Sequence, residues 1–334
     1  MERYACAEAS RKLGEDIVGS GTNHQTYVLV EYPTPWAANA LESEGLPDNL
    51  KSLIAQVEQS KRSVRFLLIN DNQTRKKKSR KVLIYEKKEK GLIKGYGKQE
   101  FEVENIDQVA EVVSKGLSKG TKHFETDSNK TRDILVCTHG NHDLCCGKYG
   151  APFYNQALIT LSELSLGNNV RMWRASHFGG HRFAPTMIDL PEGRYYGVLD
   201  QESFKSIITR SGDVSCLKKV YRGWGILPTQ IQALEREMIL VHGWDWFDYK
   251  VRGTIVGKYL DDIVIQADIT FQKPNGSKCT YRAELVKDES KTTQLKGSCG
   301  ARMESVFIKY SVENLRLHSV PVTQIRRYRD KVAS

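Results

Sequence analysis

The chain has 334 residues, which is enough for two or three domains that each bury a hydrophobic core. With 40% hydrophobic and 27% charged residues it has the composition of a globular protein, and because no apolar run approaches the roughly 18 residues that a transmembrane helix needs, a membrane protein is not expected. The net charge of +10 would suit nucleic acid or an acidic protein, but because no DNA- or RNA-binding motif accompanies it, nucleic acid is not the expected partner.

The first half of the chain alternates strands and helices. The apolar run 26–30 predicts a buried strand, and apolar residues with helical spacing follow up to about Ser60. Residues 64–69 and 81–85 predict two further strands, and Asn105 is the expected N-cap of a second helix. The predicted order is therefore strand, helix, strand, strand, helix.

The second half repeats this order. Its apolar patterns predict strands at 134–136, 170–174 and 193–199, and helices at 154–164 and 202–208. This is the core order of a thioredoxin-like fold, in which helices cover parallel strands. We therefore expect an α/β protein with tandem thioredoxin-like domains.

The last third of the chain has a different character. Pro228 is expected to open a helix whose apolar face runs from Ile231 to Val241. Residues 263–271 and 278–286 flank a turn sequence and predict a β-hairpin. This part is predicted to be an α+β appendage, and no chemistry is evident in it.

These patterns divide the chain into an N-terminal thioredoxin-like domain (1–125), a second thioredoxin-like domain (130–215) and a C-terminal α+β extension of unknown role (220–334). The N-terminal domain has Pro-Thr-Pro-Trp, ending at Trp36, where an active thioredoxin carries its redox motif. Because this segment has no thiol, we expect the domain to be a scaffold or docking module.

The cysteines indicate a reducing environment. There are seven, an odd number, and most stand apart in the sequence, which argues against a disulfide scaffold. The first residues carry charges where a signal peptide needs an apolar stretch, so a cytoplasmic protein is expected. Cys6, Cys216, Cys279 and Cys299 stand outside any metal-binding spacing and are predicted to be structural or surface residues rather than ligands.

One dense segment, from Cys137 to Gly147, begins where a strand ends, and α/β folds place functional loops at such positions. Eight residues separate Cys137 from Cys146, and after thirty more residues His177 and His181 follow with three residues between them. The two glycines between the histidines disfavour a helix and suit a tight loop that turns both imidazoles toward one centre.

Two thiolates with two imidazoles fit a tetrahedral zinc site. They fit equally a [2Fe–2S] cluster with two cysteines on one iron and two histidines on the other. Zinc fingers commonly have about two to four residues between their cysteines. The wider loop here is better able to surround a larger cluster, and zinc remains the alternative.

Two segments, CTHGNHDLCCGKYGAP and SHFGGHRFAPTMIDLPEGRYYGVL, resemble the sucrase/ferredoxin-like family, a branch of the thioredoxin-like [2Fe–2S] ferredoxins. In that family H-x3-H stands where other thioredoxin-like ferredoxins have a second cysteine pair. The resemblance covers roughly residues 132–210. It implies that Cys137 and Cys146 bind one iron of a [2Fe–2S] cluster and that His177 and His181 bind the other.

Five residues near these ligands are candidates for outer contacts: His139, His142, Asp143, Cys145 and Arg182. The histidines would hydrogen-bond a ligand or a sulfide, Asp143 would cap a turn or orient a backbone amide, and Arg182 would offset cluster charge. Plain polar loop or surface residues are the alternative. The family pattern places the ligand directly before a glycine, which leaves Cys145 as a spare thiol or a substitute ligand.

The expected function is one-electron transfer by an iron–sulfur protein. A redox or iron sensor and a structural zinc protein are the alternatives, and a thiol oxidoreductase is the least supported because no thioredoxin-type motif is present. An enzyme is not expected, since no paired-carboxylate signature of a glycosidase is found. An acidic redox partner would complement the net charge, although the basic runs 75–81 and 326–329 are expected to be a strand-connecting loop and a tail.

Overall fold

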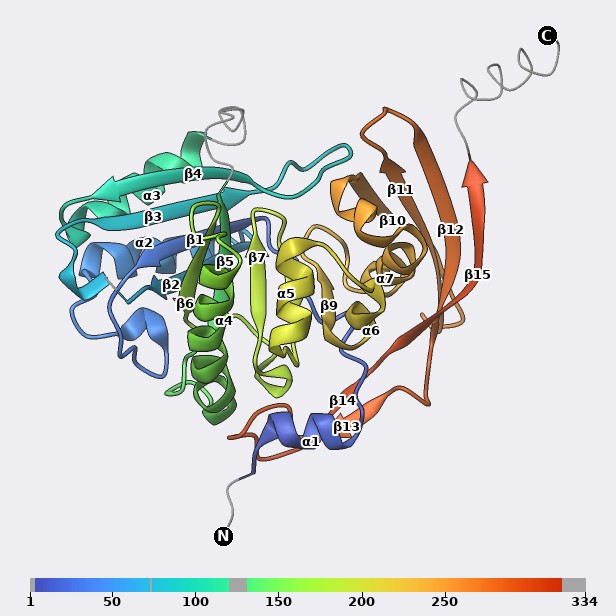
Figure 1. The fold of residues 1–334 in the computed structure, drawn as a ribbon, viewed down its shortest axis with the longest axis horizontal. Helices are drawn as coiled ribbons and strands as arrows, with labels where there is room; N and C mark the ends of the chain where they lie inside the picture. The colour runs from blue at the N-terminus through green and yellow to red at the C-terminus, as the bar shows by residue number, and fades with distance from the viewer. Residues whose placement is uncertain (1–3, 73, 120–130, 320–334) are drawn as a thin grey trace.

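The strands of both halves form one continuous sheet in the computed structural model, which describes residues 4–72, 74–119 and 131–319 (Figure 1). Within these residues the sheet has nine strands in the order β4-β3-β1-β2-β6-β5-β7-β8-β9, and the expected α/β class is confirmed. The strands are β1 (Thr26–Glu31), β2 (Val64–Asn70), β3 (Arg80–Glu86), β4 (Gly97–Val103), β5 (Arg132–Cys137), β6 (Val170–Ala175), β7 (Met187–Leu190), β8 (Arg194–Tyr196) and β9 (Tyr221–Trp224).

The same unit occurs twice in this sheet. The first unit is β1-α2-β2-β3-β4-α3 and the second is β5-α4-β6-β7-β8-α5, with helices α2 (Asp48–Gln59), α3 (Val109–Lys119), α4 (Ala151–Glu163) and α5 (Gln201–Thr209). In each unit the first two strands are parallel, and the third and fourth are antiparallel to their neighbours. Each half therefore contains the predicted order with one strand added, while the division into tandem thioredoxin-like domains stays a prediction.

Each unit has one more strand than the sequence predicted. Strand β4 is half-exposed along most of its length and lacks the apolar run of its neighbours, and β7 has only four residues. The strand predicted at 193–199 is wrong beyond Tyr196. The reason is that Val198 has a φ of 52° and donates its N–H to the carbonyl of Phe183, so the chain turns away from the sheet.

Alternate residues of the central strands belong to different layers of the core. On β1, Val28 and Val30 pack with α2 and α3, whereas Tyr27 and Leu29 belong to a core that the two units share. On β5 the same alternation places Cys137 in the shared core. Because both faces of these strands are buried, their sequences are nearly continuous apolar runs.

A buried ionic network joins the two units beside this shared core. Asp133 on β5 accepts hydrogen bonds from Tyr85 on β3 and Trp173 on β6. Its carboxylate also lies 2.7 Å from Lys98 and 2.8 Å from Arg171. Lys98 and Arg171 also pair with Glu100, at 3.2 Å and 2.7 Å, so the two cations share two carboxylates, of which Asp133 is the fully buried one.

The C-terminal part packs against the second unit. The helix predicted to open at Pro228 begins later, as α7 (Ile231–His242), and Val241 is 61% exposed because it lies at the edge of the apolar face. Among the described residues a four-stranded sheet packs on α7, and the predicted hairpin is confirmed as β11 and β12. Its strands, in the order β10-β11-β12-β15, are β10 (Lys250–Tyr259), β11 (Val264–Gln272), β12 (Lys278–Lys287) and β15 (Tyr310–Ser319).

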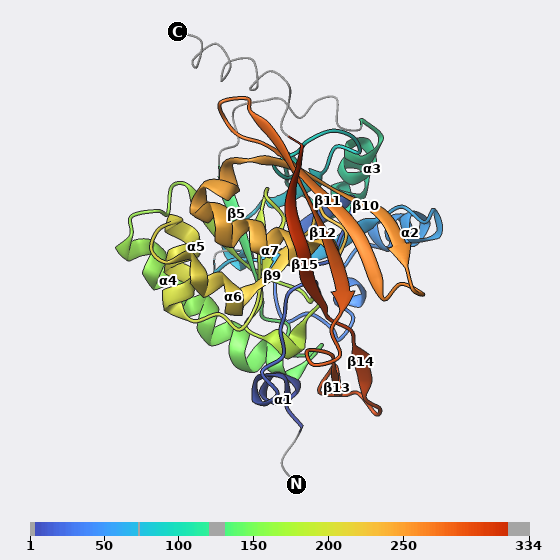
Figure 2. The same cartoon turned by 90° about the vertical axis from the view of Figure 1, so that its right-hand side faces the viewer.

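Two segments far apart in the sequence lie side by side at one end of the molecule. They are helix α1 (Cys6–Lys12) and the small hairpin of β13 (Thr293–Leu295) and β14 (Ser305–Phe307), as both views show (Figures 1 and 2). Tyr4 ties them together by donating its hydroxyl to the carbonyl of Lys296 at 3.1 Å. This contact brings the N-terminal end of the described chain against a segment close to its C-terminal end.

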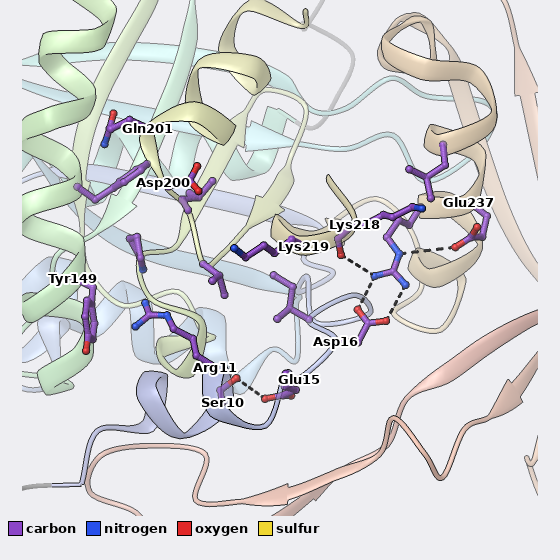
Figure 3. Close-up of a pocket in the computed structure, with 18 residues that line it drawn as sticks. Ser10, Arg11, Glu15, Asp16, Tyr149, Asp200, Gln201, Lys218, Lys219 and Glu237 are labelled. Carbon is purple, nitrogen blue, oxygen red and sulfur yellow. Dashed lines mark hydrogen bonds and ion pairs between the residues drawn. The ribbon is translucent and has the colours of Figure 1, made fainter. Parts of the chain in front are cut away.

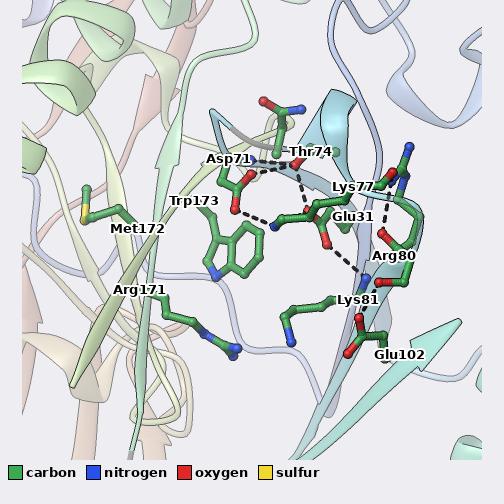
Figure 4. Close-up of polar contacts among 12 residues, drawn as sticks. Glu31, Asp71, Thr74, Lys77, Arg80, Lys81, Glu102, Arg171, Met172 and Trp173 are labelled. Atoms are coloured by element: carbon green, nitrogen blue, oxygen red, sulfur yellow. Dashed lines mark hydrogen bonds and ion pairs between the residues drawn. The ribbon is translucent and has the colours of Figure 1, made fainter. Parts of the chain in front are cut away.

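The basic run 75–81 connects β2 to β3, and part of its charge is paired within the chain (Figure 4). Lys77 lies 2.7 Å from the buried Glu31 and 2.6 Å from Asp71. The run is thus the strand connection that was predicted, with less free charge for a partner than the sequence suggests. The second run, 326–329, lies outside the described residues.

No helix in the described part of the chain is long and apolar enough to span a membrane.

Candidate metal centre

Cys137 is the last residue of β5, and its side chain lies in the core shared by the two units. The residue is 1% exposed. The backbone of the following turn lies directly against it, since a Cβ added at Gly150 would come within 1.9 Å of the Cys137 carbonyl oxygen. Glycine at this position therefore lets the turn that carries Cys146 approach the end of the strand.

Cys146 begins a single π-helical turn, Cys146–Gly150, that leads into α4. Such turns are frequent at functional sites. A Cβ added at Gly147 would lie 2.8 Å from the Cα of Gly140, so the loop between the two cysteines closes tightly on itself. As a result the Cys146 side chain is fully buried in the same core as Cys137.

His177 and His181 follow β6 in a loop that the two glycines between them turn. These glycines have φ angles of 97° and 81°, a left-handed backbone that favours glycine, so the predicted loop is confirmed. The two imidazole rings are stacked with their centroids 4.8 Å apart. Nδ1 of His177 lies 3.8 Å from Sγ of Cys137 and 3.6 Å from Sγ of Cys146. The structure thus brings the four predicted ligands to one place.

The donor atoms form two overlapping groups. Those of Cys137, Cys146 and His177 lie within 4.8 Å of one another. The donor atoms of His142, which is exposed, and of the half-buried His177 and His181 lie within the same distance of one another. His177 is therefore shared, with the thiols at one end and His181 at the other. Among the described residues Nδ1 of His181 is buried and has no hydrogen-bond partner, and a bond to a metal would satisfy this atom.

The electrostatics of the site favour a neutral imidazole and a thiolate. Burial, together with neighbouring imidazoles and arginines, lowers the pKa of His177 to about 2, so the ring is neutral and able to ligate. Burial raises the pKa of Cys137, but hydrogen bonds from Cys146 and from two backbone amides outweigh it and lower that pKa. The hydrogen bond to Cys137, together with burial, raises the pKa of Cys146.

The N-terminal unit forms one wall of this site through the segment that lacks a redox motif. His139 donates from Nε2 to the carbonyl of Ala37 at 2.7 Å, and its Nδ1 accepts the backbone N–H of His177 at 3.3 Å. Asn141 donates to the carbonyl of Trp36 at 2.7 Å. His139 therefore links the segment that carries His177 to the first unit, while its part as an outer contact of a cluster stays a prediction.

A buried arginine that the sequence analysis missed lies against the histidine loop. Arg222 on β9 is 1% exposed and donates to the carbonyls of Gly179 at 3.1 Å and Ser20 at 2.7 Å. Its third acceptor is the Ser20 hydroxyl, so all three acceptors are uncharged. Burial lowers its pKa to about 10, which leaves the guanidinium positive at neutral pH. No motif surrounds this arginine in the sequence, so only the fold identifies it.

Asp143 and Cys145, predicted as outer contacts of the four ligands, belong to a different group. Their donor atoms gather with those of Cys6 and Cys299, which come from near the two ends of the described chain. The sequence predicts both of these cysteines to be structural or surface residues rather than ligands. No spacing pattern could have related three segments that lie so far apart in the sequence.

A cavity of about 1230 Å³ lies between α1, α4 and α7, and none of the four predicted ligands lines it (Figure 3). Charged side chains in its wall are already paired, such as Asp16 with Arg236 at 2.6 Å. Glu15 is also paired, with Arg182 at 3.0 Å. Arg182, which was predicted to offset cluster charge, pairs with this carboxylate, but Lys309 shares the carboxylate at 3.0 Å, so the three groups together keep one positive charge.

Two curated proteins, both called Altered inheritance of mitochondria protein 32, are similar to part of the chain. The protein from Meyerozyma guilliermondii is 24% identical over 112 residues, which cover 32% of this chain and 40% of the relative. The protein from Debaryomyces hansenii is 31% identical over 98 residues, which cover 27% and 34% respectively. The chain thus spans less than half the length of either relative.

No solved structure matches the chain. The model of one protein family, described as sucrase/ferredoxin-like, matches residues 17–223. This range contains both sheet units, all four predicted ligands and Arg222. The chain therefore belongs to the sucrase/ferredoxin-like family.

Proposed function

We propose that this chain is an iron–sulfur electron-transfer protein that binds a [2Fe–2S] cluster through Cys137, Cys146, His177 and His181. The observation that carries the proposal is the split arrangement of the donors, with two thiols at one end and His181 at the other. A cluster with two irons needs ligands at two ends. Membership of a ferredoxin-like family supports the same cofactor.

A single zinc ion fits this arrangement less well. A tetrahedral zinc site with Zn–S bonds of about 2.3 Å holds its sulfur ligands only about 3.8 Å apart. Nδ1 of His177 lies at about this distance from both sulfurs, 3.8 Å from Cys137 and 3.6 Å from Cys146. The donor atoms of His181, however, group with those of His142 and His177 rather than with those of the cysteines. The unpartnered Nδ1 of His181 fits a ligand at the second iron.

The bound cluster would supply one-electron transfer, and two neutral histidine ligands place such clusters between roughly −150 and +300 mV. The protein residues set the surroundings of that site. Burial and positive neighbours keep His177 neutral, and His139 fixes the His177 backbone. Arg222 adds a buried positive charge without a carboxylate among its hydrogen-bond acceptors, and this charge favours the more negative, reduced state.

The partner of this site is proposed to be an acidic redox protein, which the net charge of +10 would attract. His142 is the exposed member of the histidine group and marks the side from which such a partner would approach. All seven cysteines, each within the described residues, are free. We therefore propose a reducing compartment such as the cytoplasm.

The test is the visible absorption spectrum of anaerobically purified protein, together with iron and acid-labile sulfide counts. We expect a coloured protein with two irons and two sulfides per chain. His177→Cys and His181→Cys should each keep the chromophore, shift its spectrum and lower its midpoint potential, because an anionic thiolate replaces a neutral imidazole. His318→Cys, at an exposed position of β15, is the matched control and should change neither the spectrum nor the midpoint potential.

Two results would contradict the proposal. One is a colourless protein that contains zinc and neither iron nor sulfide. The other is a chromophore that neither His177→Cys nor His181→Cys perturbs, which would overturn the ligand assignment.

A further inference from the structure

A second group of metal-binding side chains adjoins the first. The donor atoms of Cys6, Asp143, Cys145 and Cys299 lie within 4.8 Å of one another. Sγ of Cys299 lies 3.4 Å from Sγ of Cys145 and 3.5 Å from Sγ of Cys6. Sγ of Cys6 lies 3.7 Å from Oδ1 of Asp143. Cys6 and Cys145 are fully buried and Asp143 is 5% exposed, so this is an interior group rather than a chance surface cluster.

The carboxylate of Asp143 is held at both oxygens. Oδ1 accepts the backbone N–H of Cys145 at 2.9 Å, and Oδ2 accepts the backbone N–H of Cys299 at 2.9 Å. Carboxylates that ligate metals are typically oriented by hydrogen bonds of this kind. The sulfur of Cys145 also accepts the backbone N–H of Ala7 at 3.5 Å, which favours a thiolate.

We propose that Cys6, Asp143, Cys145 and Cys299 bind one structural Zn²⁺ ion. Structural zinc sites are four-coordinate and tetrahedral, and thiolates and carboxylates are among the ligands of zinc. With Zn–S bonds of about 2.3 Å the sulfurs of such a site lie about 3.8 Å apart, close to the separations in this group. A disulfide would use two of the three thiols and leave the third thiol unpaired.

The zinc ion would fasten three segments to one another. Cys6 is the first residue of α1, Cys299 lies between β13 and β14, and Asp143 and Cys145 belong to the loop that carries Cys146. A cavity of about 400 Å³, with Asp143 and Cys299 in its wall, provides a path for the ion from solvent. The site uses none of the four proposed cluster ligands and does not depend on that proposal.

The test is elemental analysis of the full chain, purified from cells grown with added zinc, for zinc and iron per chain. We expect about one zinc per chain in the unaltered protein, in line with a single four-coordinate site. Cys6→Ser and Cys299→Ser should each lose most of this zinc. Cys279→Ser, which removes a half-buried cysteine outside both groups, is the control and should retain it.

A further variant separates the two centres. Cys137→Ser should keep its zinc, because Cys137 is not a ligand of this site. Zinc that disappears in Cys137→Ser but persists in Cys6→Ser and Cys299→Ser would belong to the other centre and would overturn the proposal. Absence of zinc from the unaltered protein would overturn it as well.

A second measurement uses the unaltered protein, so it holds even if a variant fails to fold. The cysteines of the folded chain are alkylated with and without a zinc chelator, and the labelled sites are mapped by mass spectrometry. Cys299, the half-buried member of the group, should be protected until the chelator is added. Labelling of Cys299 without chelator, or a disulfide that includes Cys299, would contradict a zinc site.

Discussion

Glu31 and Cys137 occupy corresponding places in the two sheet units, yet their side chains differ in chemistry. Each is the last residue of its unit's first strand. They lie in one row across the sheet, with Glu31 beside Ile69, Ile69 beside Ala175, and Ala175 beside Cys137. Both are buried. The two units therefore offer the same position to a side chain and fill it differently.

The segments that come after the two strands explain the difference. Glu31 pairs with Lys77 and so anchors the basic connection between β2 and β3 (Figure 4). Cys137 instead lies beside His177 and the π-helical turn that carries Cys146. The segment after β1 has a structural role, because its backbone carbonyls accept hydrogen bonds from side chains in the loop that follows β5. The shared strand geometry supplies a place for a site, and the residue placed there decides the chemistry.

The largest expected effect separates these two positions directly. Cys137→Ser should lose iron and visible absorption completely, because serine does not replace a thiolate ligand of an iron–sulfur cluster. Glu31→Gln, the matched change in the first unit, should retain both. The measurement is iron content and absorption of the two variants purified side by side. Full iron content in Cys137→Ser would remove Cys137 from the ligand set.

Next in size is the effect at the second residue of each unit's first strand, where Asp133 on β5 corresponds to the uncharged Tyr27 on β1. Asp133→Ala should lower the free energy of unfolding by about 3–5 kcal/mol, because it leaves Tyr85 and Trp173 without their buried acceptor and leaves Glu100 as the remaining carboxylate of Lys98 and Arg171. Urea denaturation measures this loss. Glu58→Ala, at an exposed helix position, should change the same quantity by less than about 0.5 kcal/mol.

The same carboxylate predicts a pH dependence. Burial raises the pKa of Asp133, but Arg171 and Lys98 outweigh it and hold the pKa below its usual value. A lowered pKa in the folded state adds stability that is present above the unfolded value of about 3.9 and is lost as the pH falls below it. The stability difference between the unaltered protein and Asp133→Ala should therefore be constant above about pH 5 and shrink by about 1.4 kcal/mol per pH unit below pH 4. Denaturation at stepped pH values measures it, and a difference that stays constant through pH 3 would refute the assigned ion pairs.

The smallest effect concerns the contact of the first unit with a ligand segment. Arg65 on β2 donates to the carbonyl of His177 at 2.6 Å. Arg65→Met should retain iron and lower the midpoint potential by a few tens of millivolts, because it removes one positive charge near the site. Arg62→Met removes an exposed charge just before β2 and should leave the potential unchanged. Equal shifts in both variants would mean that overall charge, rather than this contact, sets the potential.

The grouping of Cys137, Cys146, His177 and His181 was predictable because Cys137 ends β5 and Cys146 follows it closely, while both histidines follow β6, the parallel neighbour of β5. Parallel strands bring their carboxyl ends to one edge, so two local motifs meet there. The tight loop between the histidines was equally predictable, because its two glycines are the residues that most easily adopt a left-handed backbone.

The second group could not be predicted in this way. Cys6, Cys145 and Cys299 belong to three segments that only the tertiary fold brings together. Strand β4 was missed for a different reason, because its half-exposed residues carry no apolar run. Arg222 was missed because a buried arginine has no local signature and its acceptors are backbone carbonyls and a hydroxyl. Long-range contacts of this kind are set by packing rather than by local pattern.

The packing of α7 has a consequence for dissecting the protein. The family model ends at residue 223, but the core around Phe153 and Phe204 continues without a break into Met238 and Phe271. A fragment cut at that boundary would expose a large apolar surface to water and would be prone to aggregate. The segment that the family model recognises is therefore shorter than the smallest part of this chain that we expect to fold on its own, which reaches from α1 to β15.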